Sequence, residues 1–75
     1  MKIEILGTGC AKCKKLYENT VEAVKKSGKE AEVVKVEDIK QIASYGVMST
    51  PAIVVDGVVK ASGKLLSPED IAAIL

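Results

Sequence analysis

The sequence predicts an α/β protein with a four-stranded mixed sheet flanked by three helices, in the order β-α-β-α-β-β-α. Three observations lead to this prediction. Short apolar segments rich in β-branched residues alternate with segments whose apolar residues recur every three or four positions, as in strands and helices respectively. Glycine and proline fall between these segments. A strand, a helix and a second strand in succession form a parallel pair with a right-handed crossover.

The first half of the chain reads as strand, helix, strand. Residues 3–6 are the first strand, which turns at residues 7–9 into a helix that begins at Cys10. The helical spacing predicts an inner face made of Cys13, Leu16, Tyr17, Val21 and Val24. Gly28 ends this helix, after two lysines that suit the negative end of the helix dipole. Residues 31–36, which include three valines, are the second strand.

A short helix and a hairpin follow. Glu37 or Asp38 caps the short helix, whose inner face is predicted to carry Ile39, Ile42 and Ala43. Residues 52–55 are continuously apolar, as in a strand that is buried on both faces. Asp56-Gly57 is a two-residue hairpin signal, so residues 58–61 return antiparallel to that strand.

The last helix has the most complete start signal in the chain. Ser67 is its N-cap, Pro68 occupies the first helical position, and Asp70 adds a negative charge to the first turn. Leu66 and Ile71 are spaced as a hydrophobic staple across this cap. The chain is therefore predicted to end in a helix.

Composition excludes several classes of function. With 75 residues we expect one domain, residues 1–75. Eleven basic and ten acidic residues give a net charge of +1, and two tyrosines are the only aromatic residues, so nothing favours nucleic acid. The absence of histidine excludes Ser-His and Cys-His pairs. The longest apolar run, Ile71 to Leu75, is far shorter than the ~20 residues of a membrane-spanning helix. No signal peptide is apparent. We therefore expect a cytoplasmic monomer without membrane partners.

The chemistry of the chain is concentrated in Cys10-Ala11-Lys12-Cys13, which contains the only two cysteines. This pair is predicted at the point where a strand turns into a helix. A thiol at that point faces unpaired backbone N–H groups and the positive end of the helix dipole, and Lys12, Lys14 and Lys15 act in the same direction. These groups favour the thiolate, which is the nucleophile of thiol–disulfide exchange.

The residues alone leave three interpretations of the pair. A structural disulfide would close a ring of four residues and stabilise the fold by only about 2 kcal/mol. A closed zinc site needs four ligands, and the chain offers no histidine and no further cysteine, although two thiolates can hold a soft ion such as Cu(I). The third interpretation is a redox-active dithiol, which the position at a helix start favours.

The metal interpretation has a more specific version. Small heavy-metal-associated domains carry Gly-x-x-Cys-x-x-Cys after their first strand, and residues 7–13 superficially match that pattern. That family ends on a strand, whereas residues 67–75 are predicted to be a helix. It also offers no reason for Thr50-Pro51 at the start of a buried strand.

The segment Tyr45-Gly46-Val47-Met48-Ser49-Thr50-Pro51, before the apolar residues 52–55 and the Asp56-Gly57 turn, resembles the cis-proline segment of the thioredoxin superfamily. Cys10 to Cys13 at a helix start resembles the other half of that family's signature. The short length is most similar to that of the thioredoxin/glutaredoxin-like proteins called small redox-active disulfide proteins. The resemblance implies a thioredoxin-like fold and a dithiol–disulfide oxidoreductase that needs no cofactor.

The resemblance also implies a role for individual residues. Cys10 matches the attacking nucleophile and Cys13 the resolving cysteine, while Lys12 lies inside the motif and tunes it. Pro51 matches the cis-proline, so the Thr50–Pro51 bond is predicted to be cis, and the backbone of Thr50 is expected to pair with an extended substrate. The implied partners are a disulfide-containing protein or small molecule and a disulfide reductase. The alternative is a two-thiolate carrier of a soft metal ion on the same scaffold.

Several positions depart from the family pattern. Thr8-Gly9 stands where thioredoxins have a tryptophan, and Ala11-Lys12 is neither Gly-Pro nor Pro-Tyr, so the reduction potential does not transfer. Ser62-Gly63-Lys64 replaces the Gly-Gly segment with which glutaredoxins bind glutathione. Thioredoxins use a buried acid as a proton relay, whereas Glu4, the only acid of the first strand, is expected to be a solvated or strand-end charge.

Overall fold

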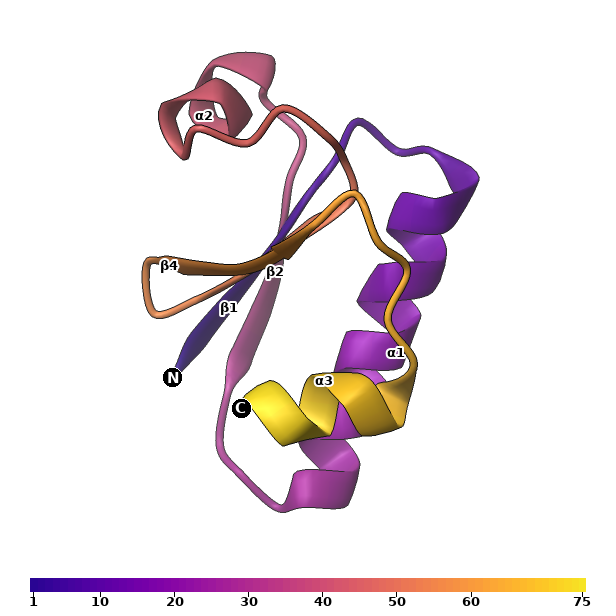
Figure 1. Cartoon of the computed structure of the whole chain (residues 1–75). Helices are drawn as coiled ribbons and strands as arrows, with labels where there is room; N and C mark the ends of the chain where they lie inside the picture. The colour runs from indigo at the N-terminus through magenta and orange to yellow at the C-terminus, as the bar shows by residue number, and fades with distance from the viewer.

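The computed structural model of the protein describes residues 1–75. The elements follow the predicted order: β1 (Lys2–Leu6), α1 (Ala11–Ser27), β2 (Glu32–Val36), α2 (Ile39–Ser44), β3 (Ala52–Val55), β4 (Val58–Ser62) and α3 (Pro68–Ile74). The strands form one mixed sheet in the order β2-β1-β3-β4 (Figure 1). β1 is parallel to β2 and antiparallel to β3, and β3 is antiparallel to β4. This confirms the predicted α/β fold.

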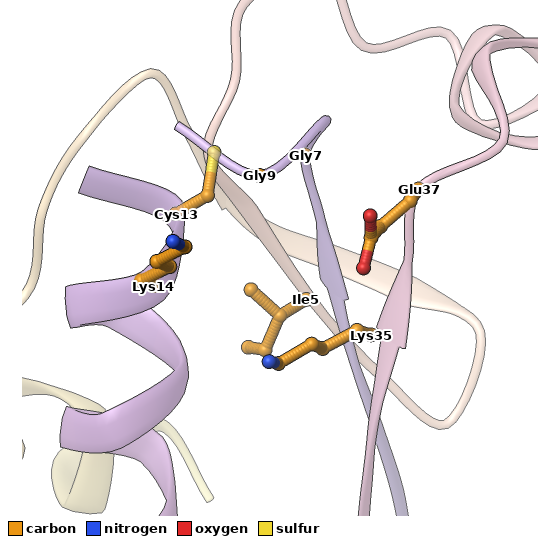
Figure 2. A pocket seen from close by; sticks show the side chains of 7 residues that line it. All are labelled: Ile5, Gly7, Gly9, Cys13, Lys14, Lys35 and Glu37. Atoms are coloured by element: carbon orange, nitrogen blue, oxygen red, sulfur yellow. The ribbon is translucent and has the colours of Figure 1, made fainter. Parts of the chain in front are cut away.

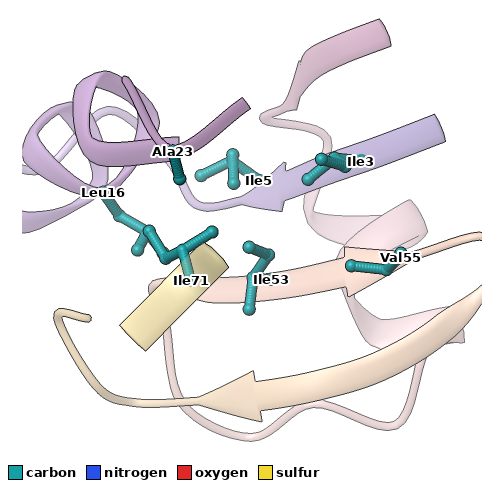
Figure 3. Close-up of a cluster of buried hydrophobic side chains, with 7 residues drawn as sticks. All are labelled: Ile3, Ile5, Leu16, Ala23, Ile53, Val55 and Ile71. Atoms are coloured by element: carbon teal, nitrogen blue, oxygen red, sulfur yellow. The ribbon is translucent and has the colours of Figure 1, made fainter. Parts of the chain in front are cut away.

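The helices cover the sheet on both faces. Because side chains alternate along a strand, β1 directs Ile3 and Ile5 to one face and Leu6 to the other. The first face packs against α1 and α3, where Ile71 of α3 lies between Leu16 and Ile53 (Figure 3). The second face packs against α2 through Ile42. No helix is long and apolar enough to cross a membrane.

The inner face of α1 is rotated from the predicted one. Val21 and Val24 are only half-buried, and two polar residues, Asn19 and Thr20, are buried instead. Both polar side chains are satisfied: the Asn19 amide donates to the carbonyl of Leu66 at 2.9 Å, and the Thr20 hydroxyl donates to the carbonyl of Leu16 at 2.7 Å. A count of apolar residues misses this face because hydrogen bonds make the two polar residues tolerable in the core.

The predicted inner face of α2 is wrong at two of its three positions. Ile42 is buried, but Ile39 is 71% exposed and Ala43 is exposed as well. The helix has only six residues, Ile39–Ser44, between its N-cap Asp38 and its C-cap Tyr45. At 3.6 residues per turn, such a short helix directs few side chains toward the sheet.

The local start and turn signals are confirmed. The Ser67 hydroxyl accepts a hydrogen bond from the N–H of Asp70 at 3.1 Å, as predicted for an N-cap. Asp56 and Gly57 both have positive φ, 48° and 84°, as a two-residue hairpin turn requires. The ends of several elements differ by one residue. β1 begins one residue earlier than predicted, β2 one residue later, and β4 ends one residue later. α1 begins at Ala11, after its N-cap Cys10, and α3 ends at Ile74.

Candidate functional site

The two cysteines lie at the start of α1 and form a disulfide, with 5.0 Å between their Cα atoms. Cys10 is the N-cap of the helix, and its Sγ accepts a hydrogen bond from the backbone N–H of Cys13 at 3.2 Å. Cys10 is exposed, whereas Cys13 is only 6% exposed. The pair therefore presents one sulfur to solvent and holds the other against the core.

Gly7, at the end of β1, is in direct contact with the buried cysteine. Its N–H donates to the carbonyl of Val36 at 3.0 Å, which fixes the backbone of Gly7 against β2. A Cβ atom at this position would overlap the Sγ of Cys13 and lie 3.0 Å from its Cβ. Sequence reasoning treated Gly7 as a turn residue. The sequence feature that could have indicated this contact is a glycine between a strand and the cysteine motif.

Thr50 and Pro51 lie at the same end of the sheet as the cysteines. Leu6 is paired with Ala52 in the antiparallel register, so Gly7 and Pro51, the residues next to them, lie beside each other at this end. The Thr50–Pro51 bond is cis, as predicted. Pro51 is fully buried and Thr50 is exposed.

Gly63, directly after β4, holds the backbone of Pro51 in place by a hydrogen bond, and sequence reasoning missed this role. Its N–H donates to the carbonyl of Pro51 at 2.8 Å. Its φ is 69°, and a Cβ there would lie 2.9 Å from the Cβ of Ser49. Glycine is therefore required by backbone conformation and by space at a position that follows β4 directly.

A cavity of about 100 Å³ lies beside the buried cysteine, and its lining includes three charged residues. Figure 2 shows Cys13 and Lys14 of α1 on one side, with Lys35 of β2 and Glu37, which follows it, on the other. Ile5 lies between the two sides. The parallel register, which pairs Leu6 with Val36, brings Glu37 to the cysteine end of the sheet. Sequence reasoning did not connect Lys35 or Glu37 with the cysteines.

The lysines of the motif region carry no ion pairs. Lys12, between the cysteines, is exposed, and so is Lys15. The protein has two salt bridges, and both involve Lys26, whose ammonium lies 3.6 Å from Glu22 and 3.7 Å from Glu69 near the other end of α1. No three Cys, Asp or Glu side chains come together in a group that could hold a metal ion.

Glu4 is neither a freely solvated charge nor a neighbour of Cys13. It is half-buried, and both of its carboxylate oxygens lie 2.8 Å from the hydroxyl of Tyr45, which donates to them. Tyr45 is the C-cap of α2 and packs against the core on that face of the sheet. Glu4 follows Ile3 and precedes Ile5, so it points to the α2 face, while Cys13 lies on the α1 face.

We expect Tyr45 to ionise at a higher pH than an ordinary tyrosine. The hydrogen bond to Glu4 raises the pKa of Tyr45 above 10.0, and desolvation and the negative charge of Glu4 act in the same direction. A raised folded-state pKa means that this pair stabilises the fold below pH 10 and ceases to do so as the pH rises through the folded pKa. Ultraviolet titration of the folded protein measures this, because Tyr45→Phe leaves Tyr17 as the only tyrosine.

The control variant for this titration is Glu4→Gln. It keeps a hydrogen-bond acceptor but removes the charge, so the Tyr45 transition should move back toward pH 10. The Tyr45 transition is the difference between the titrations of the unmodified protein and of Tyr45→Phe. If that transition does not lie above pH 10, the interaction with Glu4 is contradicted.

Comparison with known proteins agrees with this geometry. The sequence model of a thioredoxin domain family matches residues 1–75. A thioredoxin from Methanothermobacter thermautotrophicus is 45% identical over 75 residues, which cover 100% of this chain and 97% of that protein. A thioredoxin from Methanocaldococcus jannaschii is 46% identical over 69 residues, which cover 92% of this chain and 79% of that protein.

A solved structure shares the fold. It is described as the structure of a malarial protein, and it superposes with a TM-score of 0.72 at 19% identity, covering 97% of this chain and 90% of that one. Since identity is low, this likeness concerns the fold alone. The full-length family match, the two relatives and the cysteine pair at the start of α1 together show that the chain belongs to the thioredoxin family.

Proposed function

We propose that the protein is a dithiol–disulfide oxidoreductase in which Cys10 attacks substrate disulfides and Cys13 resolves the intermediate. The observation that carries this proposal is the asymmetry of the pair: the Cys10 sulfur is open to solvent at a helix N-terminus, and Cys13 is buried directly behind it. The helix N-terminus and Lys12 favour the thiolate of reduced Cys10, which is the reactive form.

The exchange has two steps. The Cys10 thiolate attacks one sulfur of the substrate disulfide, which forms a mixed disulfide and releases the other substrate sulfur as a thiolate that takes a proton from water. Cys13 then gives its proton to water, and its thiolate attacks the Cys10 sulfur of the mixed disulfide. The Cys10–Cys13 disulfide forms, and the second substrate sulfur leaves as a thiolate that takes a proton from water. Two electrons pass from the protein to the substrate, and a separate disulfide reductase returns the protein to the dithiol.

Thr50 and Pro51 are proposed to position the substrate. Their loop lies beside Gly7 at the cysteine end of the sheet, and Gly63 holds it by the hydrogen bond to Pro51. No hydrogen bond within the protein engages the backbone N–H or C=O of Thr50. These two groups are therefore available to an extended substrate chain that lies across Cys10. The reaction suits a reducing cytoplasm, where dithiols of this kind act catalytically.

Turnover with a disulfide-containing protein tests this function. With dithiothreitol as the external reductant, catalytic amounts of the protein should accelerate reduction of the substrate, and Cys10→Ser should lower the rate to that of dithiothreitol alone. The matched control is Ser44→Ala, which removes an exposed hydroxyl group from α2, outside the site. The same samples are titrated with Cu(I). Tight Cu(I) binding without turnover would instead support the two-thiolate carrier.

A further inference from the structure

Positive charge is concentrated around the cysteine pair. The start of α1 carries three lysines, Lys12, Lys14 and Lys15, and its first turn contains no acidic residue. A fourth lysine, Lys35, lies across the cavity from Lys14. The only acid that lines this cavity is Glu37. These four lysines and Glu37 together carry a charge of +3. The other seven lysines and nine acids give −2, which accounts for the total of +1.

None of these four lysines is paired with a carboxylate, so their charges can attract an anionic ligand. Both salt bridges of the protein are made by Lys26, near the far end of α1, so Lys12, Lys14, Lys15 and Lys35 have no carboxylate in ion-pair contact. Lys35 is held over the ring of Tyr17, 4.6 Å from its centroid, which leaves its charge uncompensated. The N-terminal end of the helix dipole adds to the positive potential at Cys10.

The shape of the site favours a polypeptide over a small molecule. The cavity beside Cys13 has about 100 Å³, whereas pockets that enclose small ligands usually have roughly 300–1,000 Å³. The larger groove, lined by Lys2, Glu4 and Tyr45, lies on the α2 face. Cys10 itself is exposed, and so are Met48 and Thr50 in the loop that precedes β3; Met48 is 97% exposed and can adapt to an apolar contact.

We propose that the substrates of this site are polypeptide segments whose disulfide is flanked by aspartate or glutamate. The inference rests on the proposed dithiol–disulfide exchange and names its substrate class. The step itself is the balanced exchange described above, with the reduced protein as the electron donor. Acidic residues next to the substrate disulfide would be attracted to the lysines before Cys10 attacks, which raises the rate of productive encounter.

The test uses three disulfide-linked peptides of equal length whose cysteines are flanked by aspartate, glutamine or lysine. The pre-reduced protein is mixed with each peptide in a single turnover, and released peptide thiol is measured by chromatography after acid quenching. At low ionic strength we expect the aspartate peptide to react about tenfold faster than the lysine peptide. The ratio should approach one when salt shortens the Debye length to about 3 Å, near 1 M.

Two charge reversals on the same helix provide the matched variants. Lys15→Glu changes a charge about 8 Å along the helix axis from Cys10, and Lys25→Glu makes the same change about 22 Å away. Both lysines are exposed and neither makes a salt bridge. Lys15 is chosen over Lys12 and Lys14 because it neither lies between the cysteines nor lines the cavity at Cys13. Lys15→Glu should lower the ratio of aspartate to lysine peptide about threefold, and Lys25→Glu should leave it unchanged.

The outcomes separate the two proposals. If no peptide is reduced, the oxidoreductase function fails, and the substrate class with it. If all three peptides react at equal, salt-independent rates, exchange stands and the preference for acidic segments is overturned. The same single-turnover test is also made with glutathione disulfide, which is a small anionic disulfide. If it reacts as fast as the aspartate peptide and loses the same factor in Lys15→Glu, anionic charge alone suffices and the polypeptide assignment is wrong.

Discussion

Replacing Cys13 with serine is expected to stop the reaction halfway and leave the protein covalently attached to its substrate. The Cys10 thiolate remains at the helix N-terminus and can still attack, but serine cannot displace a thiol from a disulfide. Turnover should fall to the background rate, and a mixed disulfide through Cys10 should accumulate. Mass spectrometry after incubation with a disulfide-containing protein, before and after dithiothreitol, measures the adduct and its release.

The control for this experiment is Cys10→Ser, which leaves only the buried sulfur of Cys13. It should form no adduct and show no turnover, since the remaining thiol is shielded from the substrate. Equal trapping by both variants would contradict the assignment of Cys10 as the nucleophile. Absence of an adduct from either variant, together with tight Cu(I) binding by the unmodified protein, would favour the carrier.

The features that follow from local chemistry were predictable. A capped helix start such as Ser67-Pro68 and a turn such as Asp56-Gly57 depend on backbone geometry within a few residues, so the pattern alone determines them. The position of Cys10 and Cys13 at the start of α1 follows in the same way. The parallel pairing of β1 with β2 and the hairpin of β3 with β4 were also predicted. The antiparallel pairing of β1 with β3, which sets the strand order, was not.

The features that depend on tertiary contacts were not predictable. Asn19 and Thr20 enter the core because carbonyls of Leu66 and Leu16 satisfy them, and Leu66 is distant in sequence from Asn19. Glu37 reaches the cysteine end only through the register of β1 and β2. The turn from β1 to α1 explains a glycine at Gly7 equally well, and only the fold shows that Cys13 occupies the space of its missing side chain.

Gly7→Ala is expected to have the second large effect, because the added Cβ would overlap the Sγ of Cys13. Gly7 is buried, and its hydrogen bond to Val36 prevents the strand end from moving away. Overpacking of this kind costs about 1–3 kcal/mol of unfolding free energy. Urea unfolding measures the loss of stability, and the single-turnover rate with a peptide disulfide should fall as well, since the strain displaces Cys13 from Cys10.

A double-mutant cycle shows whether Cys13 causes this cost. Gly7→Ala is measured in the unmodified protein and in Cys13→Ala, with dithiothreitol present so that no variant holds the disulfide. Removing the Sγ leaves only the Cys13 Cβ at 3.0 Å from the new methyl group, a contact that small shifts can relieve. The cost of Gly7→Ala should therefore be lower by about 1 kcal/mol in the Cys13→Ala background, which is within the range of coupling between residues in contact. The same cost in both backgrounds would mean that the alanine strains the backbone itself, and that the space at Gly7 is not reserved for the resolving sulfur.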